Sequence, residues 1–99
     1  MRLLLVRARN GEEAAFEVLF DVCKGRVYST CMAVARLQRD AEELTTQVFL
    51  TLFRNLKACK EVRDFVKKMD SLAAFLSSLH MRKRTSQMVR EPEQRVKPL

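Results

Sequence analysis

The side chains best suited to chemistry in this sequence are cations, and they gather in its second half. Residues 1–49 carry seven basic and seven acidic side chains, whereas residues 50–99 carry twelve basic and five acidic ones. All of the net charge of +7 therefore lies after residue 49. A net charge of this size bears on the partners and the solubility of a protein, but it does not indicate the fold. The second half predicts a surface that faces water or a negatively charged partner.

The cations form two segments on either side of one short predicted helix. The preceding segment holds Lys57, Lys60, Arg63, Lys67 and Lys68, and the following one holds Arg82, Lys83, Arg84 and Arg90. If the two segments converge, they form a basic surface interleaved with Phe65 and Phe75, of the kind that follows phosphates and stacks on unpaired bases. In the alternative interpretation both phenylalanines are core residues, and the lysines only keep a small helical protein soluble.

The sequence has few of the residues that catalysis or metal binding would need. His80 is the single histidine, and the pairs Glu12/Glu13 and Glu42/Glu43 fall in predicted first helical turns, where the helix dipole alone favours acids. Two glycines fourteen residues apart cannot build a phosphate-binding loop. Cys23, Cys31 and Cys59 match no zinc or redox spacing, so we expect free thiols in a reducing compartment. We therefore predict a protein that is not an enzyme and needs no cofactor.

The elements that must position these side chains are helices. Two Gly and two Pro residues leave too little turn chemistry for a β-sandwich or barrel. After a turn at residues 2–9, Asn10 and the acids behind it predict a helix start, and apolar residues recur at helical spacing to about Lys24. Beyond Gly25 we expect a second helix or a kinked continuation. A further helix is expected to start at Asp40 with a capping-box-like arrangement, and its buried stripe is Leu44, Val48, Leu52 and Leu56.

Residues 57–70 have weak periodicity, so we expect a connector with one or two helical turns. Asp70 and Ser71 are then expected to cap a last helix whose stripe is Leu72, Phe75, Leu76 and Leu79. Because Lys83, Ser86 and Arg90 continue that stripe, this helix must leave the core near His80. The prediction is an all-α fold, a small bundle of four to five helices, with one domain at 1–90 and a flexible tail or interdomain linker at 91–99. The apolar start is too short for a membrane span, so we expect a cytoplasmic protein.

Several of these segments resemble one known family in order and spacing. The most specific is residues 40–53, Asp-Ala-Glu-Glu-Leu-Thr-Thr-Gln-Val-Phe-Leu-Thr-Leu-Phe, preceded by Ala15-Phe16-Glu17-Val18-Leu19-Phe20 and Val27-Tyr28 and followed by Ala74-Phe75-Leu76. Together they resemble region 2 of bacterial sigma factors of the extracytoplasmic function group, over roughly residues 3–90. The resemblance implies a helical bundle that acts in transcription initiation.

In that family the acid-bearing helix docks on the clamp helices of the RNA polymerase β′ subunit. The connector and the last helix bind and open the −10 promoter element and hold unpaired bases of the nontemplate strand. Carried over, the resemblance implies a polymerase face of Asp40, Glu42, Glu43 and Gln47. It implies a DNA face of Arg63, Lys67, Lys68, Phe75, Arg82, Lys83, Arg84 and Arg90. An anti-sigma factor is a further partner that it suggests, and no membrane partner is expected.

Two other hypotheses stay open. One is a sigma-like helical protein-interaction module, a regulator or anti-sigma partner without promoter-melting activity. The sequence has Ser77, Ser78 and Arg82 where the family has aromatic, basic or Arg-Asn positions, which favours this alternative. The other is a nonspecific nucleic-acid-binding bundle, for which charge alone would suffice. That hypothesis leaves the match over residues 40–53 unexplained.

Overall fold

The predicted all-α bundle is confirmed by a computed structural model, which describes the backbone of residues 1–96 and the side chains of residues 1–83. The chain forms α1 (Arg2–Arg9), α2 (Glu13–Ala35), α3 (Gln38–Arg54), a 3₁₀ turn η1 (Leu56–Ala58) and α4 (Val62–Val96). Within the described residues there is no strand. The expected turn at residues 2–9 is therefore a full helix. Of the expected tail at 91–99, residues 97–99 lie outside the described residues.

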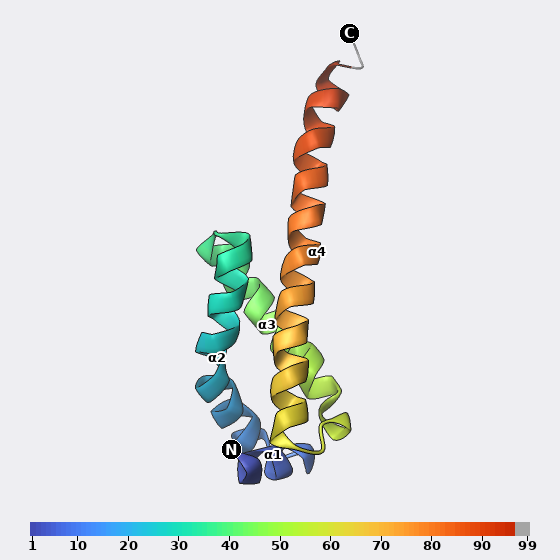
Figure 1. Ribbon diagram of the computed structural model, residues 1–99. Helices are drawn as coiled ribbons and strands as arrows, with labels where there is room; N and C mark the ends of the chain where they lie inside the picture. The colour runs from blue at the N-terminus through green and yellow to red at the C-terminus, as the bar shows by residue number, and fades with distance from the viewer. Residues whose placement is uncertain (97–99) are drawn as a thin grey trace.

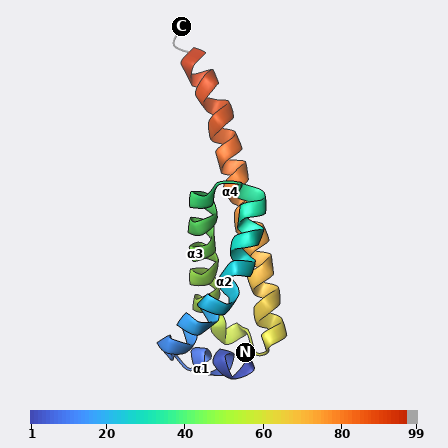
Figure 2. The same ribbon diagram turned by 90° about the vertical axis from the view of Figure 1, so that its left-hand side faces the viewer.

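Three long helices lie side by side, and α1 crosses the base of the bundle (Figures 1 and 2). α2 packs on α1, α3 and α4, and α3 also packs on α4. α4 then continues past the other helices (Figure 1). This extension makes the molecule 62 Å long and about 22 Å wide. The radius of gyration is 17.0 Å, against about 13 Å for a compact domain of this length.

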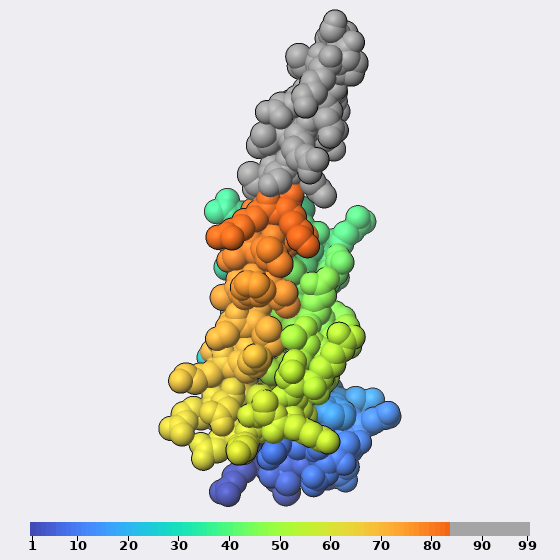
Figure 3. Space-filling model, turned by 90° about the vertical axis from the view of Figure 1, so that its right-hand side faces the viewer, coloured from blue at the N-terminus to red at the C-terminus, as the bar shows by residue number. Residues whose placement is uncertain are grey.

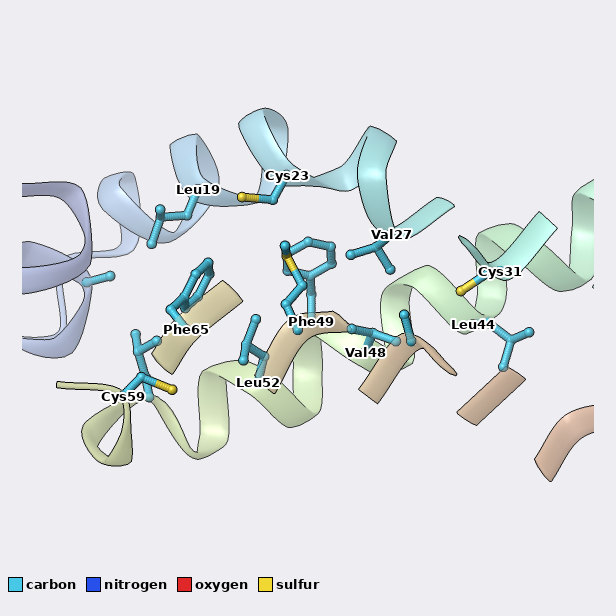
Figure 4. Close-up of a cluster of buried hydrophobic side chains, with 14 of the residues drawn as sticks. Leu19, Cys23, Val27, Cys31, Leu44, Val48, Phe49, Leu52, Cys59 and Phe65 are labelled. Carbon is cyan, nitrogen blue, oxygen red and sulfur yellow. The ribbon is translucent and has the colours of Figure 1, made fainter. Parts of the chain in front are cut away.

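The core is built from buried residues repeated every four positions. In α2 this row is Ala15, Leu19, Cys23, Val27, Cys31 and Ala35, and in α3 and η1 the predicted row of Leu44, Val48, Leu52 and Leu56 is buried throughout (Figure 4). Rows of this spacing form the ridges with which helices interdigitate. Phenylalanines join α2 to α3, since the ring centroids of Phe16 and Phe53, and those of Phe20 and Phe49, lie 4.9 Å apart.

Two predicted helix starts were wrong, since α2 begins later and α3 begins earlier than expected. α2 begins after Glu12, while Asn10 ends α1, and α2 runs without a break through Gly25. α3 begins at Gln38, because Arg36 in the left-handed conformation (φ 63°) ends α2 and Leu37 is extended. Asp40 is therefore inside the first turn of α3 rather than its cap, where its charge still suits the helix dipole.

The predicted connector at 57–70 was also wrong in its second half, because α4 starts at Val62. Phe65, Met69, Ala73 and Ser77 form the buried row of α4, and all are at most 1% exposed. Asp70, expected to be a cap, lies inside the helix, in its third turn. Its carboxylate accepts two hydrogen bonds, of 2.9 and 2.7 Å, from Nε and Nη2 of Arg26 on α2. These bonds raise the pKa of the Arg26 guanidinium and fasten α2 to α4.

Ser77 is a polar residue in an apolar row. It is fully buried, and its hydroxyl has no hydrogen-bond partner among the side chains and backbone that the structure describes. Leaving a buried donor unsatisfied costs about 1–3 kcal/mol, and alanine is also the better helix former. We therefore expect Ser77→Ala to raise the free energy of unfolding by about 1 kcal/mol in urea denaturation. A loss of stability would mean that the hydroxyl makes a stabilising bond.

Candidate nucleic-acid interface

The outward side of α4 carries a row of two cations with an aromatic ring between them. Lys68, Phe75 and Arg82 are seven residues apart, or two helical turns, so they share one face of the helix. All three are exposed, and Phe75 is 63% exposed. At a rise of about 1.5 Å per residue the row is about 21 Å long. We call it the outer row of α4.

The lower end of the outer row borders a groove between α4 and η1. The groove has a volume of about 470 Å³ and is lined by Asp64, Lys67, Lys68 and Ser71 of α4 together with Asn55, Ala58 and Cys59. Both lysines are exposed, so their ammonium groups reach solvent at the edge of this groove. Cations beside a concave surface suit a ligand that carries phosphate and has a flat apolar part.

The remaining residues of the predicted DNA face are not all on this row. Arg63 is exposed near the start of α4, and its Nη2 lies 3.1 Å from Oε2 of Glu61. Lys83 is exposed beside Arg82. The side chains of Arg84 and Arg90 lie outside the described residues. Phe65 is fully buried, so for this residue the core interpretation was right, whereas Phe75 is a surface residue and its place in the predicted buried stripe was wrong.

The predicted polymerase residues of α3 do not share a single face. Glu43 and Gln47 are exposed, with Leu50 (51% exposed) and Arg54 continuing the same face at helical spacing. Glu42 instead borders a groove of about 390 Å³ between α2 and α3, together with Phe20, Lys24 and Tyr28. Leu50 was not among the predicted residues of this face. Its position seven residues after Glu43 was the signal that could have found it.

Asp40 is turned toward α4. Its Oδ2 lies 3.2 Å from Nε2 of His80, which suits an ion pair when the imidazole is protonated, and the Asp40 side chain is only 18% exposed. This pair joins the start of α3 to α4 close to the point where α4 leaves the bundle. Of the four acidic or amide residues predicted for a polymerase face, Glu42, Glu43 and Gln47 are exposed and Asp40 is half-buried.

The three cysteines are free, as predicted, and all three are buried. Burial raises the pKa of the Cys23 and Cys59 thiols above the ordinary value, which keeps them protonated at neutral pH. A protonated, buried thiol is a poor nucleophile. The cysteines therefore contribute to packing.

Comparisons of the sequence with protein-family models and curated proteins found no match, and neither did a comparison of the fold with solved structures. Within the described part of the chain, no helix is long and apolar enough to cross a membrane.

Proposed function

We propose that this chain is a sigma-type domain that docks on RNA polymerase and binds unpaired promoter DNA, and that it acts in the cytoplasm. The proposal joins the sequence resemblance of residues 40–53 to one structural observation. Exposed acidic and amide side chains lie on α3, and an exposed aromatic ring between cations lies on α4, so two different surfaces are available for two partners.

The DNA part of the proposal depends on Phe75. A phenylalanine ring that is 63% exposed on a helix contributes nothing to the core of the bundle. Aromatic rings on a basic surface stack on unpaired bases, while neighbouring Lys and Arg residues bind the phosphates of the strand. The outer row of α4 supplies both, because Lys68 and Arg82 lie two turns before and after the ring.

The polymerase part depends on Glu43, Gln47 and Leu50. Side chains of these three types present negative charge, hydrogen-bonding capacity and apolar area on one helix face. A helix face of this kind suits a helical partner that carries cations, and electrostatic complementarity would set the orientation of docking. Asp40 would act indirectly, by holding the start of α3 against α4 through His80.

A sigma-like interaction module is the second candidate, and two observations favour it. Leu50 is 51% exposed beside Gln47, and an apolar groove adjoins Glu42 on the other edge of α3. Both features serve a protein partner and neither needs DNA. The two candidates differ in whether the outer row of α4 binds single-stranded DNA.

The decisive experiment measures the affinity for each of the two partners in a pair of charge-reversal variants. We expect Glu43→Lys to weaken binding to an isolated β′ clamp-helix fragment by about tenfold or more at about 150 mM salt, because it replaces an attractive charge by a repulsive one. Binding to single-stranded DNA should stay equal or become tighter. Isothermal titration calorimetry and fluorescence anisotropy would measure the two affinities.

Glu17→Lys is the matched control, since Glu17 is an exposed acid on α2 and the reversal changes the net charge equally. This variant should bind the clamp-helix fragment like the unchanged chain. If both reversals weaken binding to the clamp-helix fragment equally, the binding depends on net charge alone, and the specific docking face on α3 is wrong. If the unchanged chain does not bind the fragment at all, the sigma-type proposal fails and the interaction module becomes the better candidate.

A further inference from the structure

A second groove lies at the base of the molecule, between α1 and the start of α4. It has a volume of about 680 Å³, and its charged lining residues are Arg2, Lys60, Glu61 and Arg63, over a floor that includes Leu5 and Val62. We call it the basal groove. Figure 3 shows the blue chain of α1 at this end of the molecule, below the yellow start of α4.

The basal groove carries an excess of positive charge. Three of its charged residues are cations and one is an acid, and that acid is already paired, because Oε2 of Glu61 lies 3.1 Å from Nη2 of Arg63. Arg2 and Lys60 are both exposed, so their charges face solvent across the groove. A surface with this charge attracts an anionic ligand.

Hydrogen bonds fix the segments that flank the groove. Nη2 of Arg9 donates to the backbone carbonyl of Lys57 at 3.2 Å, which ties the end of α1 to η1. Oδ2 of Asp64 accepts a hydrogen bond of 3.3 Å from the backbone N–H of Glu61, which fixes the connector at the start of α4. Arg2 and Lys60 therefore sit on anchored segments.

Arg63 and Lys67 lie between the basal groove and the outer row of α4. Arg63 lines the basal groove, and Lys67, one turn later on the same helix, lines the groove between α4 and η1 that borders Lys68. Exposed cations therefore lie at intervals along this path: Arg82 and Lys68 on the outer row, Lys67 and Arg63 in the first turns of α4, and Lys60 and Arg2 in the basal groove, with the acids Asp64 and Glu61 among them. The spacing of one turn is about 5.4 Å.

We infer that the single strand bound along the outer row of α4 continues around the base of the bundle, where Arg2 and Lys60 bind its phosphates in the basal groove. This inference rests on the proposed function, because it assumes that α4 binds a strand. It adds two phosphate-binding residues that the sequence resemblance does not assign, and it predicts a longer footprint than the outer row alone would give.

Strand length provides the test. The outer row of about 21 Å spans about 6 nucleotides at 3.4 Å per nucleotide, so a strand of about 15 is needed to reach both sites. We expect the double variant Arg2→Gln/Lys60→Gln to weaken binding of the longer oligonucleotide. The slope of log affinity against log salt should fall by about 1.4, because each lost contact on a single strand contributes about 0.7. Binding of the shorter oligonucleotide should not change.

The control double variant is Lys24→Gln/Arg39→Gln, which removes the same charge from exposed positions on α2 and α3. It should leave the slope for the longer strand unchanged. If Arg2→Gln/Lys60→Gln acts like this control, or weakens both strand lengths equally, the extended path is wrong. A Phe75→Ala variant measured in parallel separates the two proposals, because its effect on both strand lengths tests α4 binding independently of the basal groove.

Discussion

Replacing Phe65 with alanine is expected to remove about 3–5 kcal/mol from the free energy of unfolding, the range for deleting a buried phenyl ring. Phe65 is fully buried, and its ring lies between Leu19 of α2, Leu52 of α3 and Cys59 (Figure 4). Its loss opens a cavity where three elements meet. Since a domain of this size has a stability of about 5–15 kcal/mol, the variant would lose a large part of it. Urea denaturation followed by circular dichroism would measure the change.

Phe75→Ala is the matched control, because it deletes the same ring from the same helix at an exposed position. Its stability should change by no more than about 0.5 kcal/mol. The comparison therefore tests the rotation of α4 in the bundle. Equal losses at the two positions would mean that α4 buries a different face from the one described.

Phe75→Ala is expected instead to weaken binding of single-stranded DNA by about 5- to 150-fold. Stacking of one base on an aromatic side chain contributes about 1–3 kcal/mol, and about 1.4 kcal/mol corresponds to a factor of ten. The salt dependence should stay the same, because the phosphate contacts of Lys68 and Arg82 remain. Fluorescence anisotropy with a labelled oligonucleotide at several salt concentrations would give both quantities.

Val22→Ala controls for the removal of an exposed apolar side chain, since Val22 on α2 is also 63% exposed. We expect no change in DNA affinity for this variant. Double-stranded DNA of the same length supplies a second comparison, because its bases are already stacked and cannot cover the ring. If Phe75→Ala weakens both forms of DNA equally, stacking on Phe75 is refuted.

The sequence predicted the fold where residue type and spacing agree. Leu44, Val48, Leu52 and Leu56 repeat every four positions with polar residues between them, and all four are buried. The start of α4 was missed because the residues there are mostly charged, so their average composition resembles that of a loop. The buried row nevertheless continues through this segment at Phe65 and Met69, between Arg63, Lys67 and Lys68. A search for every fourth residue would have found this row.

Other features could not be predicted, because they depend on residues far apart in the chain. Arg26 and Asp70 are 44 positions apart, and nothing in either segment predicts their paired hydrogen bonds. Residue type does not indicate burial at two positions of α4. Ser77 is polar but fully buried, and Phe75 is apolar but exposed, since the rotation of the helix decides which side chain faces the core.

The length of α4 has a consequence for how the helix forms. Its 35 residues correspond to about 52 Å, and only the first part packs against the bundle (Figure 1). An isolated helix must first form a nucleus, whose statistical weight is only about 10⁻³. In α4 the turns that pack against the bundle already supply this nucleus. The projecting turns can therefore form by extending an existing helix, without a new nucleation step. A ligand that binds there meets a preformed helix and pays less ordering entropy than it would on a free peptide.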